Sequence, residues 1–129
     1  MIVADTNVWA RALLGDDAKQ SLIARRALAA ARSKEGVFVP LLVMAEMAWV
    51  LRGAKWPRER VLKTLESLLR TRGVTPEAPD LVRRAIDSTR HGGGFVDHLI
   101  AEVGFANGCL GAITFDALFG KAPKIRKLD

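Results

Sequence analysis

The fold of this chain is limited most by a few short apolar runs that alternate with longer segments of helical pattern. The runs "MIVAD" (residues 1–5), "VFV" (37–39) and "LGAITFD" (110–116) are too short for helices, so they predict buried strands, with "KIRKL" (124–128) as a last edge strand. Helices are predicted over residues 6–17, 19–36, 40–52, 57–73, 74–90 and 95–107, with a helical turn after residue 116. Strands that alternate with helices favour an α/β fold in which helices flank a short, mainly parallel central sheet. We expect one domain over residues 1–129.

The composition describes a globular protein with an excess of positive charge. Hydrophobic residues make up 50% of the chain and charged residues 26%, and 20 Lys and Arg against 14 Asp and Glu give a net charge of +6. That excess favours a polyanionic partner, with nucleic acid ahead of an anionic membrane, although it also serves solubility. The longest run without polar side chains, Val37–Ala45, is too short to span a membrane, and Cys109 has no second cysteine to pair with. We expect a cytoplasmic protein with no membrane partner.

Glu46 is the only charged residue in the apolar stretch from Val37 to Leu51. Its neighbours three and four positions away on a helix are all apolar: Leu42, Val43, Trp49 and Val50. We therefore expect its carboxylate to face protein, where an unpaired ion costs several kcal/mol. An ion pair with an arginine or a position at the edge of the apolar face would make that tolerable, and so would a metal ion.

Three aspartates have ordinary local explanations when they are taken singly. Asp5 and Asp116 follow apolar runs and suit helix N-caps, and Asp97 lies in the first turn of its helix. In a parallel sheet, however, the carboxyl ends of the strands share one edge, so these aspartates and Glu46 are expected to face one crevice. Four carboxylates within about 5 Å would repel by about 3 kcal/mol per pair at an effective dielectric of about 20. Such an all-oxygen cluster predicts a Mg²⁺ or Mn²⁺ site.

The chemistry expected of that site is phosphodiester hydrolysis. A carboxylate-bound Mg²⁺ or Mn²⁺ lowers the pKa of a bound water and neutralises charge on a phosphate oxygen, with at most one acid acting as general base. A basic surface would attract the nucleic-acid backbone to it. Arg11, close in sequence to the first acid, is a candidate for a phosphate contact.

Four blocks of the sequence resemble the PIN-domain ribonucleases, in particular the VapC toxins of toxin–antitoxin pairs. They are "MIVADTNVWARALLGDD", "LLVMAEMAWVLRG", "GGGFVDHLIAE" and "AITFDALFGKAPKIRKL". The resemblance implies a PIN-like fold in which Asp5, Glu46, Asp97 and Asp116 are the metal-binding, catalytic acids. It also implies supporting roles for Thr6 and Asn7 beside the first acid and for Thr114 near the last.

The resemblance further implies a Mg²⁺- or Mn²⁺-dependent endoribonuclease that is the toxin of a type II toxin–antitoxin system. Such toxins are homodimers, are inhibited by a small cognate antitoxin, and contact operator DNA only through the antitoxin complex. One departure is His98, which stands where the family has alanine, so that its ring either alters a substrate contact or points into solvent.

Two other functions stay open from the sequence. A catalytically silent module could keep the scaffold and bind only nucleic acid or antitoxin, although a repelling acid cluster then has no evident use. A phosphotransfer enzyme could use Asp5 as a nucleophile, but "DTN" lacks the second acid of the Asp-x-Asp pattern found in such phosphatases.

Overall fold

The computed structural model describes all residues from Met1 to Asp129, which group into two compact units, Met1–Glu77 and Ala78–Asp129. The single domain expected over residues 1–129 stays a prediction. No helix in the structure is both long enough and apolar enough to cross a membrane.

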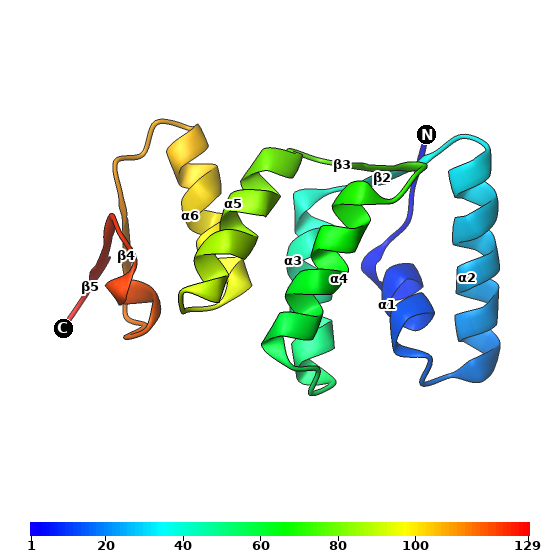
Figure 1. The fold of residues 1–129 in the computed structure, drawn as a ribbon, viewed down its shortest axis with the longest axis horizontal. Helices are drawn as coiled ribbons and strands as arrows, with labels where there is room; N and C mark the ends of the chain where they lie inside the picture. Colours follow the sequence, from blue (N-terminus) through cyan, green and yellow to red (C-terminus); the bar gives the residue numbers. More distant parts are fainter. The chain divides into compact units, whose positions relative to one another are not determined.

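The first unit is a three-stranded parallel sheet with four helices in its connections (Figure 1). Its elements are β1 (Ile2–Val3), α1 (Thr6–Leu14), α2 (Ala18–Ser33), β2 (Val37–Val39), α3 (Leu41–Gly53), α4 (Arg58–Arg70) and β3 (Val74–Pro76). The strand order is β1-β2-β3, with Val37 of β2 opposite Ile2 on one side and Val74 on the other. Because β1 and β2 run in the same direction, α1 and α3 both begin at the carboxyl edge of the sheet.

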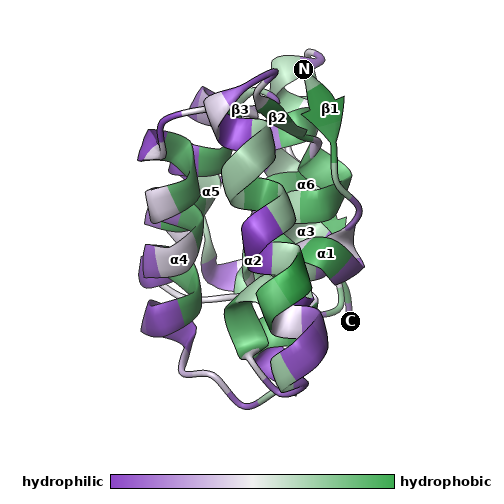
Figure 2. Ribbon diagram, turned by 90° about the vertical axis from the view of Figure 1, so that its right-hand side faces the viewer, coloured by the Kyte–Doolittle hydropathy of each residue, from purple (hydrophilic) through white to green (hydrophobic).

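The core of the first unit lies where α3 and α4 pack together and against β2. Val37 and Val39 of the central strand are completely buried. The buried side chains of the two helices are Val43, Met44, Met47, Ala48 and Leu51 from α3, and Val61, Leu62, Leu65 and Leu68 from α4. In α4 they recur every three or four residues, and Figure 2 shows the helix as hydrophobic on one side and hydrophilic on the other. Burying each such leucine contributes roughly 1.5–3 kcal/mol.

The second unit pairs two helices and adds a small two-stranded sheet. Its elements are α5 (Pro79–Arg90), α6 (Phe95–Ala106), β4 (Ala112–Thr114), the 3₁₀ turn η1 (Phe119–Lys121) and β5 (Ile125–Lys127). Strands β4 and β5 are parallel, with Ala112 opposite Ile125. The side chains of α5 and α6 that are buried include Val82, Ile86, Phe95 and Leu99.

The predicted elements are confirmed except at residues 74–76, and two strands that were expected to be buried are exposed. Residues 74–76 form strand β3, whereas the sequence predicted a helix there, because Pro76 sits at the end of a strand that pairs with β2 over three residues. Strand β1 was expected to be buried, yet Ile2 and Val3 are 44% and 62% exposed because β1 is an edge strand of its sheet. Strand β4 was expected to be buried too, yet Ile113 is 62% exposed, because β4 belongs to a sheet of only two strands.

Candidate active site

Two of the predicted site residues are joined at the carboxyl edge of the first sheet. Thr6 is the first residue of α1, which follows β1, and Glu46 lies on α3, which follows β2. The Thr6 hydroxyl donates a hydrogen bond of 3.1 Å to Oε1 of Glu46. The hydroxyl therefore orients Glu46, and it connects segments forty residues apart in the chain.

Asp5 is the N-cap of α1. Its Oδ1 atom accepts a hydrogen bond of 3.2 Å from the Val8 backbone N–H, which has no partner inside the helix. The Asp5 side chain is exposed, and so is Asn7 in the first turn of α1. One oxygen of the Asp5 carboxylate thus serves the helix, while a second oxygen is left to bind a ligand.

Glu46 does not face the protein interior as the sequence predicted; it is exposed. Helix α3 buries the side that carries Met44 and Met47, and the residues beside Glu46 on its other side are open, with Leu42 70% and Trp49 75% exposed. The charge of Glu46 is tolerated because water and the Thr6 hydroxyl solvate it.

Glu77 is a residue of this edge that the sequence analysis missed. Helix α3 begins after Pro40, which offers no side-chain cap. Glu77, directly after β3, fills that role, because its Oε1 accepts a hydrogen bond of 2.8 Å from the Leu41 backbone N–H. Its own N–H donates to the Val39 carbonyl at 2.8 Å. An acid directly after a strand was the available signal, but the local sequence predicts a helix over residues 74–90.

The second unit places the other two acids close enough to interact. Asp97 lies in the first turn of α6, and Asp116 follows β4. Oδ1 of Asp116 accepts a hydrogen bond of 2.7 Å from the Phe119 N–H, and its own N–H donates to Oγ1 of Thr114 at 3.0 Å. Thr114 therefore fixes the backbone that presents the acid.

The pKa of the Asp97 carboxyl is raised above its ordinary value of 3.8. Burial is the main cause, the negative charge of Asp116 adds to it, and His98 partly opposes both. A negative charge that raises the free energy of the ionised Asp97 carboxyl is one that a bound cation would offset.

His98 neither points into solvent nor offers a free ring to substrate. The side chain is only 4% exposed, and its Nε2 lies 2.6 Å from the Gly92 carbonyl oxygen. The ring meets Phe119 edge-on, with centroids 5.1 Å apart and an interplanar angle of 85°. The expectation that the ring points into solvent is therefore wrong, because α6 turns it toward the glycine loop and η1, whereas an effect on a substrate contact stays a prediction.

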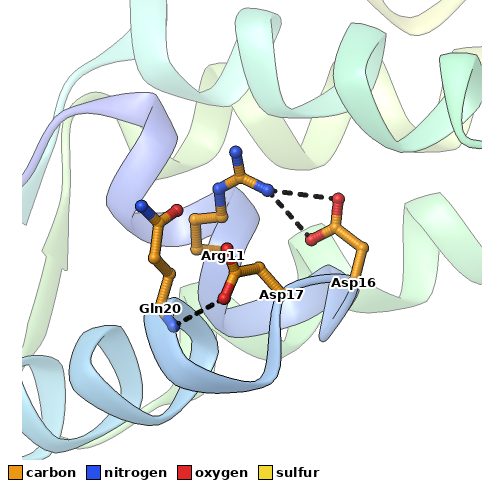
Figure 3. A network of polar contacts seen from close by, with 4 residues as sticks. All are labelled: Arg11, Asp16, Asp17 and Gln20. Carbon is orange, nitrogen blue, oxygen red and sulfur yellow. Dashed lines mark hydrogen bonds and ion pairs between the residues drawn. The ribbon is translucent and has the colours of Figure 1, made fainter.

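Arg11, the candidate phosphate contact, is paired with an acid. Its Nη1 lies 3.2 Å from both carboxylate oxygens of Asp16, and neighbouring Asp17 caps α2 by accepting from the Gln20 N–H at 3.0 Å (Figure 3). A phosphate at Arg11 would therefore compete with Asp16 for the guanidinium.

The donor chemistry of these residues suits a hard divalent cation. Carboxylate and hydroxyl oxygens are the ligands that Mg²⁺ and Mn²⁺ prefer, and no thiolate or free imidazole accompanies them. Two of the four predicted acids belong to the first unit, and the other two to the second. The structure gathers no group of three or more His, Cys, Asp or Glu side chains that could hold a metal ion.

The comparison with known proteins identifies the family. The PIN domain family model matches residues 2–125, a range that contains all four acids. No curated protein matches the chain in sequence. PIN domains are generally nucleases, and they act on nucleic acid. The match extends over almost the whole sequence, and the chain belongs to the PIN domain family.

Proposed function

We propose that this protein is a Mg²⁺- or Mn²⁺-dependent endoribonuclease, and that it acts in the cytoplasm as the toxin of a type II toxin–antitoxin pair. The observation that carries the proposal is the family match, because it extends over both units and includes every predicted acid. The excess of positive charge supports a polyanionic substrate.

In this proposal Asp5, Glu46, Asp97 and Asp116 together hold one or two metal ions, although they belong to different units. When bound, Mg²⁺ or Mn²⁺ activates a water molecule and neutralises charge on the phosphodiester. Thr6 holds Glu46 in position through the hydrogen bond to Oε1. Asp97 is the acid best suited to carry a proton, because burial and Asp116 both favour its protonated form.

The toxin role, a homodimer and a small antitoxin partner rest on the resemblance of the four acid-bearing blocks to VapC toxins. In that role the antitoxin would cover the acids and would carry the contact with operator DNA. These partners are part of the proposal, and co-purification with the product of a neighbouring reading frame would test them.

The activity is tested by incubating the purified chain with total cellular RNA in Mn²⁺ and sequencing the new ends. We expect discrete cuts with 5′-phosphate ends that EDTA and Asp97→Asn both abolish. Asp87→Asn is the matched control, since it removes an exposed acid of α5 whose side chain is 75% exposed and makes an ion pair with Arg90. This variant should cut like the wild type.

Cuts that persist in Asp97→Asn or in EDTA would contradict the proposed site. RNA that is bound in Mn²⁺ without being cut would favour the catalytically silent module instead. A phosphoaspartate trapped at Asp5 would favour phosphotransfer.

A further inference from the structure

The turn between α3 and α4 concentrates much of the positive charge of the chain. We call residues Arg52–Lys63 the basic turn. Its five basic residues are Arg52, Lys55, Arg58, Arg60 and Lys63. Glu59 is the only acid in this segment, so its net charge is 5 − 1 = +4, out of +6 for the whole chain. All five basic residues are exposed, and all lie in the first unit.

The basic turn is built around Trp56. The indole is half-buried, and the Arg60 guanidinium lies over it with Cζ 3.7 Å from the ring centroid. The Trp56 carbonyl accepts a hydrogen bond of 2.8 Å from Nη1 of Arg52, and the Trp56 N–H donates to the Leu51 carbonyl at 3.1 Å. A guanidinium that stacks through its face keeps N–H donors at its edge, and these suit phosphate oxygens.

Two of these charges lie where the helix dipole disfavours a cation. Arg58 and Arg60 are the first and third residues of α4. The helix macrodipole is positive at this end, so an acid is favoured there and a cation is disfavoured. Glu59 fits that preference, whereas the two arginines oppose it. Arg60 gains its contact with the Trp56 ring, whereas the placement of Arg58 is accounted for if an anion binds over the turn.

The basic turn lies close enough to Glu46, a proposed site residue, for one short stretch of single-stranded RNA to contact both. Figure 1 shows the turn at the end of the α3–α4 pair that is remote from β2 and β3. Arg52 lies six residues after Glu46 on α3, which is about 9 Å along the helix axis at 1.5 Å per residue. That is about three steps of a stacked nucleic-acid strand at about 3.4 Å each.

We propose that the basic turn, Arg52–Lys63, is a binding surface for the phosphate backbone of single-stranded RNA, outside the four-acid site. It holds nucleotides that flank the bond being cut, and so it contributes to affinity and not to the chemical step. This inference rests on the proposed function only in naming RNA as the partner. An acidic protein segment is the competing partner, and competition with polyglutamate tests it.

The test measures binding without cleavage. A labelled single-stranded RNA is titrated with the full chain in EDTA at several salt concentrations. The test variant is Lys55→Gln, Arg58→Gln and Lys63→Gln combined, which leaves the contacts of Arg52 and Arg60 with Trp56 intact. The matched control removes three exposed charges of α2 and its C-cap: Lys19→Gln, Arg26→Gln and Lys34→Gln. Melting temperatures of both variants verify that they fold.

If the basic turn binds RNA, the test variant should lose about tenfold or more in affinity at moderate salt. The slope of log K against log salt should become shallower by about 2, because each lost phosphate contact on a single strand accounts for about 0.7. The control variant should keep both the affinity and the slope of the wild type.

Three results would overturn the inference. One is equal loss in both variants, which would show that only net charge matters. Another is a test variant that loses no affinity, which includes the case in which the wild type itself does not bind RNA. The third is displacement of the RNA by polyglutamate at equal charge concentration, which would favour an acidic protein partner. Cleavage in Mn²⁺ is measured separately, so failure of this surface and failure of the nuclease proposal are distinguishable.

Discussion

Asp5 has two roles in this protein that a pair of substitutions can separate. It caps α1 through the hydrogen bond from the Val8 N–H, and it is proposed to bind the metal through its charge. Asn keeps an oxygen at the same position and is as good an N-cap as Asp, whereas Ala removes the acceptor. We therefore expect Asp5→Asn and Asp5→Ala both to be inactive, but to differ in stability.

The expected difference follows from the single exposed bond of 3.2 Å. Losing an N-cap acceptor costs about 1 kcal/mol, and Asn loses only a few tenths through the missing charge at the helix N-terminus. For a chain of this length, about 1 kcal/mol lowers Tm by roughly 3–5 °C. Thermal unfolding in EDTA should therefore place Asp5→Ala a few degrees below Asp5→Asn, which should lie close to the wild type.

RNA cleavage in Mn²⁺ completes the comparison. An active Asp5→Asn enzyme would refute the metal-binding role, because a neutral amide cannot replace the charge. Equal stability of the Ala and Asn variants would refute the capping role and with it the reasoning from this bond.

Three further changes test other features. Asp97→Asn should raise Tm in EDTA at neutral pH. Because the pKa of Asp97 is raised, the folded state binds more protons than the unfolded state above pH 3.8, and the stability of the wild type falls as pH rises there. The gain in Tm from Asn should therefore vanish below pH 3.8. Thr6→Val should lower kcat/KM about five- to tenfold in a cleavage assay, because Glu46 loses the bond that orients it, while Tm changes by less than about 3 °C. Gly73→Ala should lower the free energy of unfolding in urea by about 2 kcal/mol or more, because φ is +82° and the new Cβ would collide with the Arg32 carbonyl oxygen. The control Ser67→Ala, on the exposed side of α4, should lower it by less than about 0.5 kcal/mol.

The helices and most strands could be predicted because their signals are local. Gly15 ends α1 in the left-handed conformation, with φ 66°, and the apolar positions of α4 recur at helical spacing. Strand β3 was missed because three residues that contain a proline carry little strand signal of their own. Pairing with β2 makes Val74–Pro76 a strand, and that contact is not visible in the local sequence.

The environment of each acid was harder to predict than its identity. Both sides of α3 are rich in apolar residues, so the sequence could not tell which side is buried, and Glu46 was placed on the wrong one. Likewise, the burial of His98 depends on Gly92 and Phe119, which lie on segments before and after α6. Periodicity places a residue on a face of its helix, but only the packing of other elements decides what that face meets.

Two of the proposed metal-binding carboxylates also accept hydrogen bonds from backbone amides, so metal binding would affect the exchange of those amides. Asp5 and Asp116 each hold an amide proton, that of Val8 and that of Phe119, on one oxygen. An ion bound to the other oxygen would restrain the carboxylate and, through it, the opening of those amides. Loading at a hundred times Kd would add about 2.7 kcal/mol to the stability of the bound state. Hydrogen exchange at these two amides would then report the filling of the site, without any substrate being present.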